Sequence, residues 1–304
     1  MSDQIEMQAE GIDSPQPVDT RLSYSSQSLL TNCQQRYVYY KVDKVEKDKD
    51  AAARDDSHFA IGKSFHYILE VSNHEKPTKI GALLEYCVQN EGLKEEDCAL
   101  VHGMVLQYLR LRADSGWIAV KCEHVIKHES VIGFIDLIEK KEYGDWCISD
   151  IKTAATFYPT KIAQFPSDVQ LNLYASFYKE IAKEYGLDPK KFLVCRYLVT
   201  TKSKAKQQAK ESYNDFVMRL VNKKHVKSHN IFIPKALMRI KETRAEFMAN
   251  HKLSLKLRSK KLKPTRNYTY CNAFFKCWEY FSKCHGMEYS EFLETNKIVV
   301  ESTK

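Results

Sequence analysis

Two predicted strands and the turn between them lie in Gly133-Phe-Ile-Asp-Leu-Ile-Glu-Lys-Lys-Glu-Tyr-Gly-Asp-Trp-Cys-Ile-Ser-Asp-Ile-Lys-Thr153. Residues 131–138 and 146–153 are rich in apolar and β-branched side chains, which is typical of buried strands. The polar residues between them contain Gly144 and suit a hairpin loop. In such an antiparallel pair Asp136 lies opposite Asp150, give or take one residue, and Lys152 points to the same side as Asp150.

Two carboxylates and one ammonium group therefore meet inside strands that are otherwise built for burial. Charged side chains are rarely buried without partners, and neighbouring carboxylates repel each other. A divalent cation between Asp136 and Asp150 would remove this conflict, and hard oxygen ligands favour Mg²⁺ or Mn²⁺. Lys152 could then orient a water molecule or hold a negatively charged reacting group. From the two strands alone, a structural salt bridge between Lys152 and either carboxylate remains an alternative to the metal site, at about even odds.

The charge of the chain is unevenly distributed along its 304 residues. Residues 1–200 hold 24 Lys and Arg against 30 Asp and Glu, whereas residues 201–304 hold 23 against 9. A basic final third favours a polyanionic partner, nucleic acid before membrane, over a merely solvated Lys-rich surface. No apolar run reaches transmembrane length and no signal peptide is visible, so we expect a soluble, cytoplasmic protein without membrane contact. Nine cysteines at irregular spacing indicate thiols rather than a disulfide framework.

The remaining elements are predicted from apolar periodicity and capping signals. Residues 1–20 are acidic and lack aromatic side chains, which predicts a disordered tail. Pro166 and Pro234 are each expected in the opening turn of a helix. Helices are expected near 25–33, 59–71, 80–89, 97–113, 166–184 and 236–255, and the basic segment after 201 is expected to lead into a helix that ends at about 222. Further strands are expected at 120–127 and 191–200. The order helix, three strands, helix, strand predicts an α/β fold with a mixed sheet.

Three further side chains join the candidate site from predicted helices. His66 lies on the same side of its helix as Gly62, although a lone histidine on such a face is more often a core residue than a ligand. Gln170 and Tyr174 are four residues apart and therefore share one face of the following helix.

Taken together, these pieces resemble the RecB-like branch of the PD-(D/E)XK nucleases, which includes small CRISPR-associated exonucleases, the AddB nuclease domain and many phage exonucleases. The similarity spans about residues 23–284, and each motif is weak alone but strong as part of an ordered set. The matching motifs are Ser23-Tyr-Ser25 with Leu29, Cys33 and Arg36-Tyr37; Gly62 with His66; Gly133-Phe-Ile-Asp136; Asp150-Ile-Lys152; and Gln170 with Tyr174.

The resemblance implies a restriction-endonuclease-like core, an α/β fold with a mixed central sheet flanked by helices and with helical N- and C-terminal segments. Residues 21–200 would form this nuclease core with a helical insertion. Residues 201–304 would form a basic helical region with a cysteine cluster that packs back on the N-terminal helix.

The resemblance also implies roles for the individual side chains. His66, Asp136, Asp150 and the Ile151 carbonyl would hold one or two Mg²⁺ or Mn²⁺ ions, the imidazole favouring manganese. Lys152 would position the attacking water or stabilise the transition state. Gln170 and Tyr174 would hold Lys152 or a phosphate in place. Glu70 and Glu123 are further candidates near the metal, although a surface or packing role is more common for each.

A second feature of the family concerns the cysteines. One N-terminal and three C-terminal cysteines bind a [4Fe–4S] cluster in some members, and here the set would be Cys33, Cys271, Cys277 and Cys284. The spacing C-x5-C-x6-C departs from the frequent C-x2-C-x5-C, and the proline that often follows the family's cysteines is missing. Free thiols and a zinc site therefore remain alternatives.

The predicted function is metal-dependent hydrolysis of DNA by an exonuclease acting on ends or single strands. Its setting would be DNA recombination, repair or phage DNA processing in a bacterial or phage-infected cytoplasm, with a recombination or replication protein as partner. The basic segments 202–210 and 252–266 would follow the DNA backbone, and nearby aromatic residues would stack on bases. The alternatives are a non-catalytic DNA-binding subunit of the same fold and an RNA nuclease.

Overall fold

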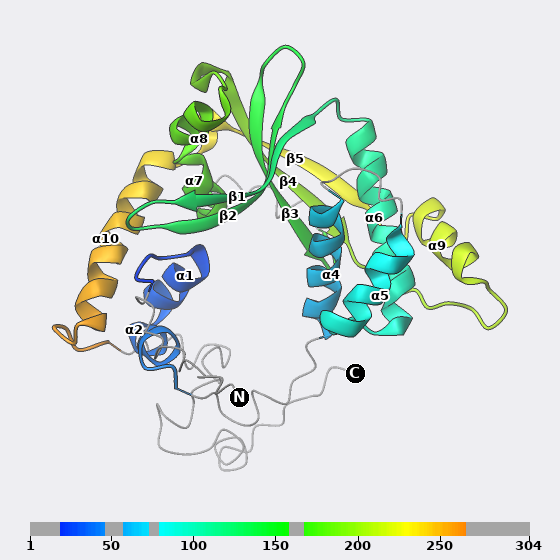
Figure 1. Cartoon of the computed structure of the whole chain (residues 1–304), viewed down its shortest axis with the longest axis horizontal. Coiled ribbons are helices and arrows are strands. Elements are labelled where there is room, and N and C mark those ends of the chain that lie inside the picture. The colour runs from blue at the N-terminus through cyan, green and yellow to red at the C-terminus, as the bar shows by residue number, and fades with distance from the viewer. Residues whose placement is uncertain (1–18, 46–56, 73–78, 158–166, 266–304) are drawn as a thin grey trace, which may run out of the picture.

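A mixed sheet organises the computed structural model, which describes residues 19–45, 57–72, 79–157 and 167–265 (Figure 1). Within these residues the sheet has five strands in the order β1-β2-β3-β4-β5. Strands β3 and β4 pair in parallel, and all other neighbours are antiparallel. The strands are β1 (Ile118–Lys127), β2 (Ile132–Lys140), β3 (Trp146–Ala154), β4 (Phe192–Thr201) and β5 (Ser228–Pro234). The predicted mixed α/β fold is confirmed.

Helices cover both faces of the sheet (Figure 1). The alternation of side chains along β3 sends Ile148 into a core shared with α7 and α8, and Ile151 into a core shared with α4, α5, α6 and α9. The helices of the two layers are α4 (Ser57–Val71), α5 (Ile80–Asn90), α6 (Cys98–Ala113), α7 (Val169–Ala175), α8 (Tyr178–Tyr185), α9 (Tyr213–Asn222) and α10 (Ile240–Arg258).

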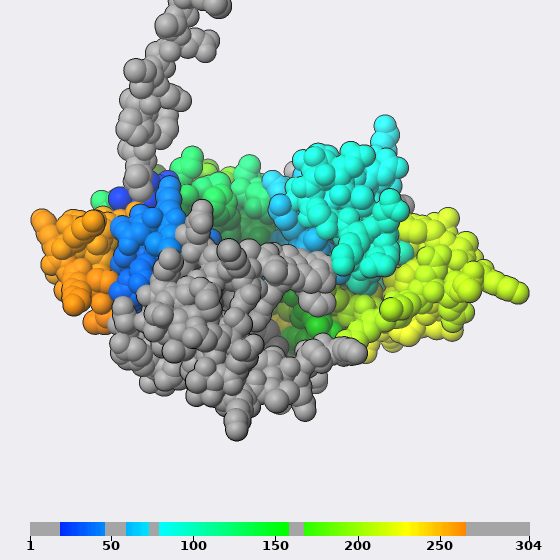
Figure 2. Space-filling model, turned by 90° about the horizontal axis from the view of Figure 1, so that it is seen from below, coloured from blue at the N-terminus to red at the C-terminus, as the bar shows by residue number. Residues whose placement is uncertain are grey.

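The first described helices, α1 (Tyr24–Asn32) and α2 (Gln34–Tyr37), pack beside α10. Leu22 forms a parallel bridge with Val131, the residue before β2, and a small core joins Leu22 and Leu30 to Leu257 of α10. Seen from below, α10 and the blue N-terminal helices lie at one end of the molecule, and α4 to α6 with α9 lie at the other (Figure 2). The ends of the described chain therefore meet on one side of the sheet.

The structure differs from the sequence predictions in three elements. Strand β5 was not predicted, and Pro234 is its last residue instead of the first turn of a helix. A proline is tolerated there because β5 is an edge strand whose final N–H group is not needed for the ladder. The expected helix 236–255 is a short 3₁₀ turn, Lys235–Leu237, followed by α10.

The expected helix 166–184 is also wrong, because α7 and α8 are separate helices with a break at Ser176 and Phe177. Helix α7 begins under the cap of Asp168, whose Oδ1 accepts a hydrogen bond from Leu171 N at 3.0 Å. The basic segment after residue 201 leads into a helix that ends at Asn222, as predicted, and Ser212 caps this helix, α9. Residues 1–18 of the predicted tail 1–20 and Pro166 lie outside the described residues.

Candidate active site

The two predicted aspartates meet where β2 and β3 separate. The ladder between these strands ends at Leu137 and Ser149, so Asp136 lies opposite Asp150 one residue further on. Beyond the end of the ladder, a side chain of β2 accepts the hydrogen bond from β3 in place of a backbone carbonyl. Asp136 Oδ2 accepts this hydrogen bond from Ile151 N at 2.6 Å. The carboxylate of Asp136 is thereby fixed against β3, as the hairpin register predicted.

A hydrogen-bonded chain joins β3 to α7. Lys152 Nζ lies 2.8 Å from Asp150 Oδ2 and donates to Gln170 Oε1 at 2.9 Å. Gln170 Nε2 donates in turn to Asp150 Oδ1 at 3.2 Å and to the Tyr174 hydroxyl at 2.9 Å. Because Gln170 lies in the first turn of the capped helix α7, its amide reaches both members of the Asp150–Lys152 ion pair. The structure therefore brings the five predicted catalytic side chains together.

Two glycines allow the helices to approach these strands closely. A Cβ atom on Gly133 would lie 3.0 Å from Cε1 of Tyr174, and one on Gly62 would lie 3.1 Å from Oγ1 of Thr153. Real Cβ atoms rarely make contacts this short, so larger residues at either position would push the facing side chain away. Gly133 thus seats the Tyr174 ring on β2, and Gly62 seats α4 on β3.

His66 completes the cluster from α4. Its ring is hydrogen-bonded to the backbone of Ile151, the residue between Asp150 and Lys152. Burial lowers the pKa of His66, and the charge of Asp150 opposes that effect, so the ring is predominantly neutral near pH 7. A neutral imidazole is the form that can ligate a metal ion.

Burial raises the pKa of Asp136 and that of Asp150, and the charge of Asp136 raises the pKa of Asp150 further. Lys152 lowers both pKa values but is a single cation shared by two carboxylates. Glu123 on β1 adds to the excess of acid. Burial, followed by the charges of Asp136, Glu70 and Asp150, raises its pKa to about 7. Negative charge is therefore in surplus at this point of the protein.

These residues fit a hard divalent cation. The donor set consists of carboxylate and carbonyl oxygens with one imidazole, which suits Mg²⁺ and, with the imidazole, Mn²⁺. The described residues contain no group of three His, Cys, Asp or Glu side chains already arranged as a complete metal site. In the structure Asp136 binds the Ile151 amide, Asp150 binds Lys152 and His66 binds the Ile151 backbone. A cation held by Asp136, Asp150, His66 and the Ile151 carbonyl would compete with these partners.

The site opens into a cavity of about 1090 Å³ between α4 and the sheet. Lys63, Lys94 and Lys202 line it in addition to Lys152, and Phe59 lies at its edge as a strongly exposed aromatic side chain. The carboxylates that line it are Asp136, Asp150 and Glu91. The cavity therefore combines buried acid at its inner end with basic side chains around it, an arrangement suited to a phosphate chain that approaches metal ligands.

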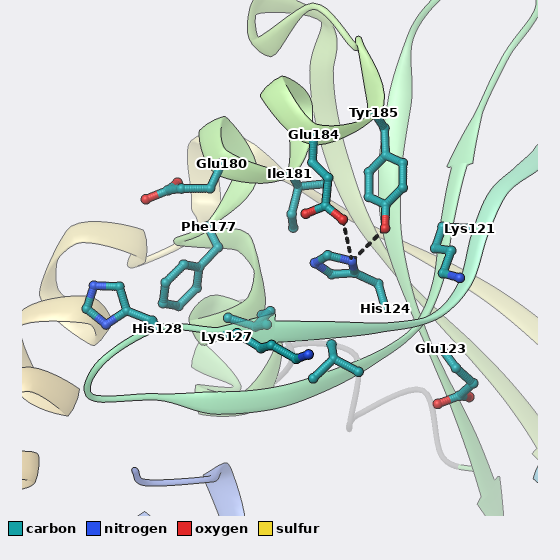
Figure 3. Close-up of a pocket in the computed structure, with 12 residues that line it drawn as sticks. Lys121, Glu123, His124, Lys127, His128, Phe177, Glu180, Ile181, Glu184 and Tyr185 are labelled. Carbon is teal, nitrogen blue, oxygen red and sulfur yellow. Dashed lines mark hydrogen bonds and ion pairs between the residues drawn. The ribbon is translucent and has the colours of Figure 1, made fainter.

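A second cavity, of about 630 Å³, lies between β1 and α8 (Figure 3). His124 points into it, with Nδ1 lying 2.8 Å from the Tyr185 hydroxyl and 3.9 Å from a carboxylate oxygen of Glu184. None of the predicted catalytic residues lines this cavity. It is thus distinct from the site on β2 and β3.

Sequence reasoning missed several residues that act on the cluster. Tyr197 lies beside Asp150 on β4, and its pKa is raised by burial and then by the charges of Asp150 and Asp168. Asp168 is also among the acids whose charge raises the pKa of Lys152. Burial raises the pKa of Tyr24 in α1, and the charges of Asp168, Lys152 and Asp150 also affect it. The sequence pattern of an apolar strand does not indicate that its tyrosine lies beside an aspartate of the neighbouring strand. The acid directly before the α7 helix was a recognisable N-cap.

The cysteine set lies mostly outside the described residues. Cys33 is buried and free at the junction of α1 and α2. Cys271, Cys277 and Cys284 fall beyond residue 265, where the described chain ends. The last described residue, Thr265, exchanges hydrogen bonds with the two residues that follow Cys33, through the Gln34 side chain and the Gln35 amide.

A family model matches most of the chain, and two solved structures are similar to it. The family model for the PD-(D/E)XK nuclease superfamily matches residues 21–267. A crystal structure from Eubacterium rectale, provisionally assigned as an exonuclease, is similar with a TM-score of 0.49 and 11% identity, covering 89% of this chain and 92% of that one. The solved structure of SSO0001 is similar with a TM-score of 0.25 and 10% identity over 67% of this chain and 78% of that one. No curated protein matches.

The chain belongs to the PD-(D/E)XK nuclease superfamily, because the family model covers most of its length. Membership implies hydrolysis of nucleic acid, and nucleases of this superfamily generally use Mg²⁺ or Mn²⁺. None of the helices in the described part of the chain is long and apolar enough to cross a membrane.

Proposed function

We propose that the protein is a metal-dependent DNA exonuclease whose catalytic centre is formed by Asp136, Asp150 and Lys152. The observation that supports this best is the pair of buried, opposed carboxylates that shares one lysine at the inner end of a lysine-lined cavity. A structural salt bridge needs one carboxylate for one ammonium group. The second carboxylate is explained by a cation that is bound during function.

The protein side chains divide the chemistry between them. A divalent cation, when bound, supplies Lewis-acid stabilisation of the phosphate and lowers the pKa of a coordinated water. Lys152, kept charged by Asp150, stabilises negative charge that develops on the phosphate oxygens. Gln170 keeps the Lys152 ammonium group directed towards Asp150, and Tyr174 holds the Gln170 amide. These contacts fix the reacting groups before the substrate arrives.

DNA is the proposed substrate because the C-terminal third of the chain is strongly basic. The segments 202–210 and 252–266 would neutralise backbone phosphates, and Lys202 already lines the cavity next to the catalytic residues. An exonuclease is proposed by resemblance, with recombination, repair or phage DNA processing as the setting.

The test is digestion of end-labelled linear DNA, circular single-stranded DNA and RNA of equal length, each with Mg²⁺ or Mn²⁺. We expect linear DNA to be shortened from an end and the circle to survive. Asp150→Ala should bind the same DNA without cutting it. Binding without cleavage by the wild-type protein under every metal condition would favour the non-catalytic subunit, and selective loss of RNA would favour the RNA nuclease.

A [4Fe–4S] cluster bound by Cys33, Cys271, Cys277 and Cys284 belongs to the same proposal. Cys33 is buried beside the residues that hold Thr265, and Cys271 follows only six positions later in the sequence. Six residues span up to about 20 Å, so the three later cysteines can reach Cys33. Protein purified without oxygen should be brown, and Cys277→Ala should lose the colour. Colourless protein containing zinc or only thiols would contradict the cluster.

A further inference from the structure

The side of α4 that faces the catalytic cavity carries an exposed aromatic residue at its outer end. Phe59, Gly62, Lys63 and His66 all line the cavity, and their spacing of three, four and seven residues places them on one helical face. The rise of an α-helix sets Phe59 about 10 Å from His66 along the axis. A single face of α4 therefore leads from an aromatic ring to the predicted metal ligands.

Phe59 is not explained by packing. Its side chain is 77% exposed, the largest exposed fraction among the large hydrophobic residues of the described chain. The following positions on α4 behave differently, since Ile61 and Phe65 are buried in the core. A single exposed apolar ring is ordinary on a protein surface, so what distinguishes Phe59 is its place on the lining of a cavity that also holds four lysines.

The cavity wall between Phe59 and His66 is formed where α4 packs against β3. Gly62 has no side chain, and the α4 backbone there lies directly against Thr153 of β3. Lys63, Lys94 and Lys202 line the same cavity from three different elements. The Lys202 amide donates to the Ala154 carbonyl at 2.7 Å, which fixes this lysine beside the end of β3.

The charges around this surface suit a polyanion. Four lysines and three carboxylates line the cavity, and two of the carboxylates, Asp136 and Asp150, are the predicted metal ligands. The third, Glu91, forms an ion pair with Lys63. Lysines therefore outnumber carboxylates on the cavity lining, and an aromatic ring beside a basic groove is the combination that binds single-stranded nucleic acids.

We propose that Phe59 stacks on an unpaired base of the substrate, so that the cavity selects single-stranded nucleic acid. This inference rests on the proposed nuclease function and adds the residue that recognises the strand. The lysines would contact the phosphates on either side of the stacked base. A base paired within a duplex does not expose its face, so a blunt duplex would lack this contact.

The experiment measures binding by fluorescence anisotropy in the full-length Asp150→Asn protein, which prevents cleavage. The probes are a 12-nucleotide oligothymidylate, the same strand with abasic sites, and a blunt duplex. Replacing Phe59 by Ala should weaken binding of the intact strand about 5- to 150-fold, the range of one lost base–aromatic stack. Binding of the abasic strand and of the duplex should be unchanged. Phe59→Trp should retain tight binding of the intact strand.

Tyr143→Ala is the matched control, because Tyr143 is 62% exposed and does not line the cavity. It should leave all three affinities unchanged. An equal loss on intact and abasic strands in Phe59→Ala, or no loss on either, would overturn the proposal. The melting temperature of Phe59→Ala should equal that of the parent, since an exposed ring adds little to folding.

The nuclease assignment fails in a different way. A wild-type protein that cuts no nucleic acid with any metal would refute the catalytic function, while the binding comparison could still support stacking. A wild-type protein that cuts single strands and blunt duplexes equally well, with the same rates in Phe59→Ala, would refute stacking alone.

Discussion

The β2–β3 ladder has a buried carboxylate centre near each of its ends, and the two centres differ in how their charge is balanced. At the hairpin end, Glu139 is fully enclosed and binds both Arg112 and Arg196, with Ser149 as a further donor. At the other end, Asp136 and Asp150 share Lys152. One centre has two cations for one carboxylate, and the other has two carboxylates for one cation.

The two centres also differ in their access to solvent. Arg196 is enclosed by the rings of Trp117 and Phe232, whose centroids lie 5.3 and 5.5 Å from its guanidinium carbon. The aspartates instead line a cavity of about 1090 Å³. Buried charge with excess partners, closed off from solvent, stabilises the fold. Buried charge that lacks a partner and faces a cavity indicates a site where a ligand completes the balance.

The largest effect should come from Asp150→Asn at the incomplete centre. We expect nuclease activity to fall by about 10³-fold or more, because a ligand of the cation is weakened and Lys152 loses its ion-pair partner. Initial rates on linear DNA with saturating Mn²⁺ measure the loss. Circular dichroism should show an unchanged fold, and an active Asp150→Asn would refute the assigned catalytic centre.

The second-largest effect should be on stability, and it should come from the enclosed centre at Glu139. Glu139→Gln leaves two buried guanidinium groups without a carboxylate, which should lower the free energy of unfolding by about 3–5 kcal/mol. Urea unfolding measures this change. The folded fraction should keep the specific activity of the wild type because, among the residues that the structure describes, the hydrogen-bond and ion-pair partners of Glu139 include none of the proposed catalytic residues. Lost activity at unchanged stability would mean that the hairpin end takes part in catalysis.

Sequence reasoning found one of these centres and not the other. The hairpin register placed Asp136 opposite Asp150, because period-two alternation in two apolar strands leaves little freedom in pairing. Glu139 lies in the same predicted hairpin, but its partner arginines come from α6 and β4, far away in the chain. A single sequence gives no signal for such long-range pairs.

The predicted elements failed for similar reasons. Strand β5 pairs only at the edge of the sheet, so its sequence has a short apolar run that ends in Pro234, which suggested a helix start. The break between α7 and α8 lies in an apolar segment without glycine or proline, so local propensity predicted one continuous helix. Gln170 and Tyr174 were nevertheless placed correctly relative to each other, because their spacing needs only one helical turn.

The buried carboxyl group of Asp150 should make the stability of the protein depend on pH and on divalent cations. Burial raises the pKa of Asp150 from 3.8 to about 7, so the folded protein binds more protons than the unfolded chain between these values. Without divalent cations, the free energy of unfolding should therefore fall as pH rises from about 4 to 7, by an amount on the order of 1–2 kcal/mol.

Asp150→Asn should flatten this dependence, and at pH 8 Mn²⁺ should raise the melting temperature of the wild type more than that of the variant. Urea unfolding at several pH values and thermal melts with and without Mn²⁺ measure both effects. Glu139→Gln is the control and should keep the pH slope and the Mn²⁺ shift. An equal pH dependence of the free energy of unfolding in the wild type and in Asp150→Asn would show that the carboxyl group of Asp150 does not cause it.

The smallest effect should come from the contact that supports the incomplete centre from behind. In Gly133→Ala the new Cβ atom meets Cε1 of Tyr174 at 3.0 Å and displaces the ring. Because the Tyr174 hydroxyl binds Gln170, which binds Lys152, the displacement should lower kcat about 10-fold with KM unchanged. Gly81→Ala has open space around its Cβ and should leave kcat unchanged. Tyr174→Phe keeps the ring but removes the hydroxyl, so it should reproduce the loss of kcat if positioning through Gln170 is the cause. Full activity in both Gly133→Ala and Tyr174→Phe would show that Lys152 is held without help from α7.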